Sequence, residues 1–207
     1  MRLVSTSRTT TVGLVVGDKV ILAADKRASA GPLVAHKRVK KILRITDNVA
    51  MTISGLVADA QFLADNLAHV ARSYEIDVGR PIKVSTLASF ASLLLSAYLR
   101  YSPFVVQVLI GGVDAEGPSL YYVDLFGSIS KEKYASTGSG SPVALGVLEQ
   151  GYRDGMSLEE AKELAFNAVR TALQRDGFSG EGVDIVVISR EGLVEETRIL
   201  SPEIVPR

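Results

Sequence analysis

The order in which strand-like and helix-like segments follow one another is the feature that most restricts the fold of this chain. Runs rich in Val, Ile and Leu predict strands, and apolar residues at helical spacing predict helices. Strands are predicted at residues 10–16, 19–24, 49–54, 104–113, 119–125, 129–136, 183–189 and 193–200, and helices at residues 58–74, 85–101, 142–152 and from residue 157 onward. The order is therefore strands, two helices, strands, two helices and two final strands.

Two blocks of strands and two pairs of helices must bury their apolar faces against one another. Two sheets packed face to face, with one helix pair outside each sheet, satisfy this requirement. We therefore expect an α+β fold with four layers, an αββα sandwich. No linker or repeat divides the 207 residues, so a single domain is expected.

Short local motifs predict where individual elements begin and end. Gly17 and Asp18 separate the first two strands and predict a hairpin. Ser157 and Glu160 have the spacing of a capping box, in which the two residues satisfy each other's free amides at a helix start. The polar stretch 25–32 is expected to form a turn.

Composition excludes several classes of function. Lys and Arg number 23, as do Asp and Glu, so no net charge favours binding to nucleic acid or to an anionic membrane. Cysteine is absent, which rules out disulfides, thiolate metal sites and cysteine nucleophiles and fits a reducing compartment. The two histidines, His36 and His69, are candidates for a general base but lack a recognisable partner motif, and a scaffold role is the simpler interpretation.

The beginning of the chain does not have the pattern of a membrane or secretory segment. No apolar run reaches the ~20 residues of a membrane span. The first eight residues contain Arg2 and Arg8 but no apolar core, so they are interpreted as a short leader and not as a secretory signal.

Three threonines in a row, Thr9 to Thr11, follow Arg8 and allow two interpretations. Threonine suits strands, so the run is consistent with the start of an edge strand. Alternatively, cleavage before Thr9 would give one residue both a hydroxyl nucleophile and a primary amine. An α-amino group has an ordinary pKa of roughly 7.7–8.0, so much of it is neutral near pH 7 and able to act as the base.

Several separated motifs bear on this choice. They are Thr9-Thr10-Thr11-Val12-Gly13, Ala23-Ala24-Asp25-Lys26-Arg27-Ala28-Ser29, Lys40-Lys41, Ser54-Gly55-Leu56-Val57-Ala58-Asp59, Gly138-Ser139-Gly140-Ser141-Pro142 and Arg175-Asp176-Gly177-Phe178-Ser179-Gly180. In this order they resemble proteasome β subunits, most closely the archaeal catalytic kind, from Thr9 to about Leu200. The resemblance implies an N-terminal nucleophile hydrolase fold and threonine endopeptidase activity, with residues 1–8 as a leader that is cleaved off between Arg8 and Thr9 and residues 9–207 as the domain.

The resemblance also implies roles for individual residues. Thr9 corresponds to the nucleophile, Asp25 and Lys41 to the acid and base beside it, and Gly55 to the donor of the oxyanion hole. Ser139, Asp176 and Ser179 correspond to the groups that hold and tune the free amine. Each role has a purely structural alternative. Asp25 and Lys41 would form a surface ion pair, and Gly55 would mark the end of a strand. The other three residues would be polar turn, loop or capping residues.

Lys40 is the alternative to Lys41 as the functional lysine. Adjacent residues of a strand point to opposite faces, so a shift of register by one would exchange them. The family motif selects Lys41. The segment Gly138-Ser139-Gly140-Ser141 lacks the Lys-Ser/Thr pair of a phosphate-binding loop and the third glycine of a dinucleotide turn, so nucleotide binding is not expected.

Seven residues correspond to the family's substrate-binding positions, and none is charged. They are Ala28, Ser29, Val39, Leu43, Ile53, Val57 and Gln61. An uncharged pocket favours an apolar or aromatic side chain before the cleaved bond, because a buried unpaired charge is costly. The resemblance thus implies a broad, chymotrypsin-like preference and requires no metal or organic cofactor.

Arg8 departs from the family, which usually has glycine immediately before the catalytic threonine. A side chain restricts the φ angle in the tight turn needed for self-cleavage. A non-catalytic ring subunit that keeps its leader is therefore the main alternative, and a bacterial two-ring protease subunit is a third. The implied partners are α subunits and other β subunits in stacked seven-membered rings, an unfoldase ATPase and unfolded polypeptide, in the cytoplasm.

Overall fold

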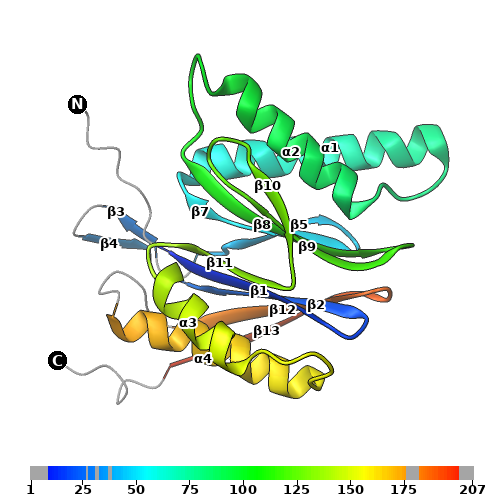
Figure 1. Ribbon diagram of the computed structural model, residues 1–207. Coiled ribbons are helices and arrows are strands. Elements are labelled where there is room, and N and C mark those ends of the chain that lie inside the picture. Colours follow the sequence, from blue (N-terminus) through cyan, green and yellow to red (C-terminus); the bar gives the residue numbers. More distant parts are fainter. Residues whose placement is uncertain (1–8, 27, 31–32, 37–38, 176–181, 201–207) are drawn as a thin grey trace.

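Two antiparallel sheets lie face to face between two pairs of helices (Figure 1). The computed structural model describes residues 9–26, 28–30, 33–36, 39–175 and 182–200. The strands are β1 (Thr10–Val16), β2 (Lys19–Asp25), β3 (Ala28–Ala30), β4 (Leu33–His36), β5 (Ile42–Thr46), β6 (Val49–Thr52), β7 (Ser54–Gly55), β8 (Val106–Asp114), β9 (Gly117–Val123), β10 (Ile129–Glu132), β11 (Tyr134–Gly138), β12 (Val183–Ser189) and β13 (Gly192–Arg198). The helices are α1 (Val57–Val78), α2 (Val84–Tyr98), α3 (Ser141–Gly151) and α4 (Leu158–Arg175).

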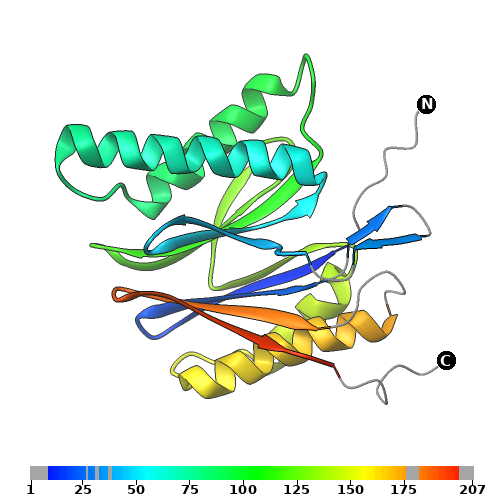
Figure 2. The same cartoon turned by 180° about the vertical axis from the view of Figure 1, so that it is seen from behind.

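Apart from β3 and β4, which pair only with each other, the described strands belong to two large sheets. The first sheet has the order β11-β1-β2-β12-β13, and the second has the order β10-β9-β8-β6-β5, with β7 pairing beside β6 on β8. Helices α3 and α4 cover the outer face of the first sheet, and α1 and α2 cover that of the second (Figures 1 and 2). The expected four-layer αββα sandwich is confirmed.

Three clusters of buried apolar side chains fill the spaces between the four layers. One lies between the two sheets and includes Leu22, Leu109 and Leu120. The second joins the second sheet to α1 and α2, and the third joins the first sheet to α3 and α4. Burial on both faces explains why the central strands are nearly continuous runs of apolar residues.

One predicted strand is in fact two strands that belong to different sheets. Residues 129–136 were expected to be continuous, but β10 pairs with β9 in the second sheet and β11 pairs with β1 in the first. The change occurs at Lys133, whose carbonyl accepts a 2.8 Å hydrogen bond from the Val15 amide of β1. The chain therefore crosses from one sheet to the other within a stretch that contains none of the usual turn residues Gly, Pro, Asn or Asp.

Other differences concern boundaries. The predicted strand 49–54 is interrupted at Ile53, whose amide donates to the Lys41 carbonyl at 2.8 Å. The expected turn at 25–32 is partly strand, because β2 extends through Asp25 and β3 pairs with β4. Helix α1 is longer than predicted, since it ends at Val78 and is capped by Gly79, which has a left-handed φ of 72°.

The two local motifs behave as predicted. The Ser157 amide donates to Glu160 Oε2 at 2.8 Å, and the Glu160 amide donates to Ser157 Oγ at 3.3 Å, which is the capping box at the start of α4. Gly17 and Asp18 connect β1 to β2, with Val16 opposite Lys19. Among the helices of the described ranges, none is long and apolar enough to cross a membrane.

Candidate active site

A buried ion pair lies where β1 begins. Asp25 is the last residue of β2 and has no exposed surface, and the Lys41 side chain is 3% exposed. Lys41 Nζ donates to Asp25 Oδ1 at 2.9 Å, and the Thr10 backbone amide donates to the same oxygen at 2.9 Å. One carboxylate oxygen therefore holds both the lysine and the peptide bond that follows Thr9.

Backbone hydrogen bonds on both sides of Lys41 fix its segment beside β2. The Val39 amide donates to the Lys26 carbonyl at 2.9 Å, and the Lys41 carbonyl accepts from Ile53. Lys26 is itself held by Asp184, whose Oδ1 lies 2.5 Å from Lys26 Nζ. The segment before β5 is thus tied both to the end of β2 and to the residue that separates β6 from β7.

The neighbouring lysine points elsewhere. Lys40 is exposed, and its Nζ contacts Glu195 of β13 at 2.7 Å, with both side chains at least half exposed. The two adjacent lysines thus lie in opposite environments. Of these two lysines, Lys41 is the one beside Asp25 and the start of β1.

Thr9 is almost completely buried, at 1% exposure, and lies against the end of β11. Thr10 is opposite Gly138 in the β1–β11 register. Gly138 has a φ of 94°, and a Cβ atom there would stand 1.9 Å from the Thr9 carbonyl oxygen. Only glycine fits a backbone this close with this φ. The next residue, Ser139, is exposed at the same end of the sheet.

Gly55 lies in β7, which is adjacent to β11. Its φ is 120°, and a Cβ there would stand 2.1 Å from the Val105 carbonyl oxygen, so this position also requires glycine. The Ser54 hydroxyl would lie 3.0 Å from a Cβ at Gly138. The β7 segment, which carries Gly55, therefore lies close to the end of β11 and to Thr9.

The remaining predicted residues are distributed as follows. Ile53 is buried, Val39, Leu43 and Val57 are half-buried, and Gln61 is exposed. Val57 and Gln61 are one turn apart at the beginning of α1, close in sequence to β7. Ala28 and Ser29 belong to β3. Three of the predicted residues, Arg8, Asp176 and Ser179, lie outside the described residues.

The burial of this pair has energetic and chemical consequences. Removing two charges from water is unfavourable, and a buried pair is tolerated only when geometry and additional hydrogen bonds compensate. Here the Thr10 amide supplies such a bond. An ammonium held in a buried position acts over several ångströms with less screening than it would at the surface. The arrangement can therefore bias the protonation of a nearby amine or hydroxyl.

Sequence reasoning missed several contributors to this region. The Thr10 amide was missed because a backbone hydrogen bond leaves no mark on residue type. Gly138 is within a quoted motif, but its contact with Thr9 depends on the strand register. The hydroxyls of Thr11, Thr52 and Thr137 form a buried cluster behind Thr9, and the threonine run was the one signal that pointed to part of it.

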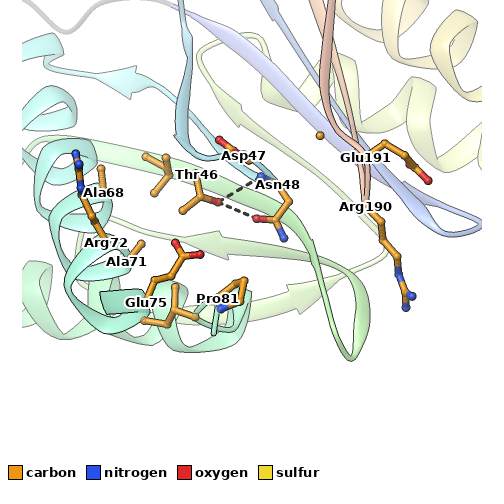
Figure 3. A pocket seen from close by; sticks show the side chains of 13 residues that line it. Thr46, Asp47, Asn48, Ala68, Ala71, Arg72, Glu75, Pro81, Arg190 and Glu191 are labelled. Carbon is orange, nitrogen blue, oxygen red and sulfur yellow. Dashed lines mark hydrogen bonds between the residues drawn. The ribbon is translucent and has the colours of Figure 1, made fainter. Parts of the chain in front are cut away.

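A hollow of about 630 Å³ lies elsewhere, at the opposite end of the strands (Figure 3). It is bounded by the β5–β6 turn, the end of α1 with the segment that follows it, and the β12–β13 turn. The labelled lining residues are Thr46, Asp47, Asn48, Ala68, Ala71, Arg72, Glu75, Pro81, Arg190 and Glu191. Since β12 begins opposite Asp25 and ends beside the hollow, the two places are separated by roughly 20 Å of strand. None of the predicted site residues lines it.

The described ranges show no arrangement of side chains suited to a metal ion. No group of three or more His, Asp or Glu side chains is placed there to hold a metal ion.

Comparison with known proteins places the chain in a family. A family model described as proteasome subunit matches residues 6–188. The chain is 64% identical over 201 residues to proteasome subunit beta 2 of Staphylothermus marinus, covering 97% of each chain. It is 66% identical over 191 residues to proteasome subunit beta 2 of Desulfurococcus amylolyticus, covering 92% of this chain and 93% of the relative. Proteasome subunit beta 1 of Pyrobaculum aerophilum is 52% identical over 184 residues, or 88% of this chain and 91% of the relative. With its two-sheet sandwich and these similarities, the chain belongs to the proteasome subunit family, as a β subunit of the archaeal type.

Proposed function

We propose that this β subunit is a catalytic threonine endopeptidase whose nucleophile is Thr9, freed by cleavage of the Arg8–Thr9 bond. The observation that carries the proposal is the buried contact of Asp25 with both Lys41 and the Thr10 amide. Lys41 Nζ lies no more than twice 2.9 Å from the Thr10 nitrogen, because each is 2.9 Å from the same oxygen. An ordinary surface ion pair, which is the alternative interpretation of Asp25 and Lys41, would be exposed to solvent.

The chemistry proceeds in two steps. The Thr9 Oγ attacks the carbonyl carbon of the substrate, and its proton passes to the neutral Thr9 amine. The tetrahedral intermediate collapses, the peptide C–N bond breaks, and the amine gives the proton to the departing nitrogen. Water then attacks the ester, again losing a proton to the Thr9 amine, and the ester bond breaks to restore the Thr9 hydroxyl.

Two groups of the site support these steps. The Lys41 ammonium favours the neutral form of the Thr9 amine, because a nearby positive charge disfavours a second positive charge. It favours the developing negative charge on Oγ, because opposite charges attract. The Gly55 amide is proposed as donor to the oxyanion, an interaction worth about 3–4 kcal/mol in comparable acyl-transfer enzymes. Ser139, Asp176 and Ser179 are proposed to hold the amine.

The substrate is proposed to be unfolded polypeptide, cut after apolar or aromatic residues with broad preference. Ile53, Leu43, Val39 and Val57 offer an uncharged, partly buried lining, with Gln61 at the exposed side of α1. The proposed assembly is stacked heptameric rings with α subunits and other β subunits, served by an unfoldase ATPase in the cytoplasm. No metal or organic cofactor takes part.

A second function, that of a structural ring subunit that keeps residues 1–8, is favoured by one observation. Arg8 stands where glycine would ease the turn required for self-cleavage. The two functions predict different behaviour of the same variant.

The test is Thr9→Ala, followed through leader removal and peptide hydrolysis in the assembled particle, with Thr9→Ser as the matched variant. We expect Thr9→Ala to retain residues 1–8 and to lose hydrolysis, whereas Thr9→Ser keeps a hydroxyl and retains part of both. Hydrolysis at the wild-type rate in Thr9→Ala particles would contradict the proposal.

A further inference from the structure

Three buried threonine hydroxyls connect the two sheets directly behind Thr9. Thr11 of β1 lies opposite Thr137 of β11, and their Oγ1 atoms are 2.7 Å apart. The Thr11 hydroxyl donates to Thr52 Oγ1 of β6 at 3.2 Å, across the space between the sheets. The Leu109 amide of β8 donates to the same Thr52 oxygen at 3.0 Å. We refer to Thr11, Thr52 and Thr137 as the threonine bridge.

The bridge has a defined direction. Each hydroxyl has one hydrogen to donate. Because Thr11 gives its hydrogen to Thr52, the short contact with Thr137 requires the Thr137 hydroxyl to donate to Thr11. Thr52 then accepts from both Thr11 and the Leu109 amide, so the hydroxyls and one backbone donor form a continuous chain.

The location of the bridge is unusual for polar groups. All three threonines are at most 1% exposed. Between the sheets, the neighbouring buried side chains are apolar, such as Leu22, Ile42 and Ala135. Apolar packing is non-directional, whereas a hydrogen bond weakens steeply with distance and angle. The bridge can therefore fix the relative position of the two sheets more narrowly than apolar contacts do.

The bridge lies between the two parts of the proposed site. Thr11 follows Thr9 by two residues on β1, and Thr52 precedes Gly55 by three residues, on the segment leading into β7. Thr9 and Gly55 come from different sheets, so their separation depends on how these sheets are held together. In an acyl-transfer site, a displacement of about 1 Å can reduce the rate on the order of 100-fold.

We propose that the threonine bridge is a positioning device that sets the Thr9 hydroxyl relative to the Gly55 amide. This inference rests on the proposed endopeptidase function. It assigns no contact with substrate to the bridge. Thr11, Thr52 and Thr137 act through the strands that carry the reacting groups.

The test compares Thr52→Val with Thr52→Ser in assembled particles, with rates normalised to the fraction of chains beginning at Thr9 by intact mass. Valine keeps the shape and removes the hydroxyl, whereas serine keeps the hydroxyl. We expect Thr52→Val to lower kcat for a fluorogenic peptide roughly 10- to 100-fold with KM changed less than about 3-fold. Thr52→Ser should recover most of the lost kcat.

A matched control removes another buried hydroxyl far from the site. Ser189 Oγ, at 9% exposure, donates to the Gly192 carbonyl at 3.3 Å and accepts from the Glu191 amide at 3.2 Å. Ser189→Ala should lower the midpoint of thermal unfolding while leaving kcat within about 2-fold, since the β12–β13 turn is roughly 20 Å of strand from Thr9.

Thr137→Val provides a second way to break the bridge and leaves the Leu109–Thr52 bond in place. If Thr52→Val does not assemble, Thr137→Val carries the same expectation for kcat. The inference is overturned if either valine variant assembles with kcat unchanged, or if Thr52→Ser restores stability but does not restore kcat. It is also overturned if neither valine variant assembles, because the bridge would then be required for folding. Failure of the proposed function is recognised separately, by wild-type particles that hydrolyse no peptide or no more than Thr9→Ala particles.

Discussion

Charged side chains are buried and paired at one end of the sandwich and exposed to solvent at the other. Where β1 begins, Asp25 and Lys41 are buried and hydrogen-bonded to each other. At the far end, Arg72, Glu75 and Arg190 border an open hollow of about 630 Å³ (Figure 3). The comparison teaches that charges which are buried and hydrogen-bonded, and not charges open to solvent, point to chemistry in this fold. The buried charges mark the candidate site, and none of the predicted site residues lines the hollow.

The largest effect is expected from replacing Lys41, with the adjacent Lys40 as the control. Lys41→Met should reduce peptide hydrolysis by about 10²- to 10⁴-fold, the usual contribution of a group that assists proton transfer. It should also destabilise the fold by about 3–5 kcal/mol, because Asp25 remains as an unpaired buried charge. Lys40→Met should leave kcat within about 2-fold, since its partner Glu195 is an exposed surface residue. Peptide kinetics and denaturant unfolding measure both effects.

The double variant Asp25→Asn with Lys41→Met separates stability from activity. Removing both charges should recover much of the lost stability, because no unpaired charge remains buried. Hydrolysis should stay as low as in Lys41→Met. Recovery of activity along with stability would show that the pair is structural and not catalytic.

A smaller effect on stability is expected from filling the space beside Thr9. Gly138→Ala combines a strained φ, worth about 1–3 kcal/mol, with a clash against the Thr9 carbonyl. Gly146→Ala on α3 is the control, because a Cβ there meets no atom within 4 Å and alanine favours a helix by about 0.5–1 kcal/mol. Thermal unfolding should therefore move in opposite directions for the two alanine variants. A tolerated Gly138→Ala would contradict the close packing of β11 on Thr9.

The next effect concerns a partly exposed ion-pair network on α4 and β13. Burial acts to raise the pKa of the Glu196 carboxyl, but hydrogen bonds from Lys162 and Arg198 outweigh it and lower that pKa. A lowered pKa contributes stability above the ordinary glutamate pKa of about 4.3 and loses it as pH falls through the folded value. Glu196→Gln should therefore cost about 0–1 kcal/mol at pH 7, and this cost should shrink as the pH falls below the ordinary glutamate pKa. A cost that grows as the pH falls would contradict this sign.

The smallest effect is expected at the hollow. Arg72→Ala and Arg190→Ala should change the free energy of unfolding by no more than about 0.5 kcal/mol, as is usual for surface substitutions. Peptide kcat and KM should be unchanged within about 2-fold. A large loss of hydrolysis in either variant would mean that the two ends of the sandwich are coupled.

Much of the architecture was predictable from the sequence because it depends on burial. Strands and helices with apolar faces can form few layered arrangements, and the four-layer sandwich was one of them. The exchange of partners at Lys133 was not predictable, because residues 129–136 have one strand-like pattern and the choice of sheet is made by distant strands.

The site was predictable only where residue types carry the chemistry. The threonine run, Asp25 and Lys41 were identified by motif, and the structure brings the last two together beside Thr10. The bonds from the Thr10 and Leu109 amides were hidden, since every residue other than proline has the same backbone donor. Asp176 and Ser179 remain predictions.

The most direct test of the central claim is the intact mass of this subunit in assembled particles. Release of residues 1–8 must precede any use of the Thr9 amine as a base, so the account predicts a chain that begins at Thr9. Particles in which the Arg8–Thr9 bond remains whole, yet which are fully assembled, would contradict it.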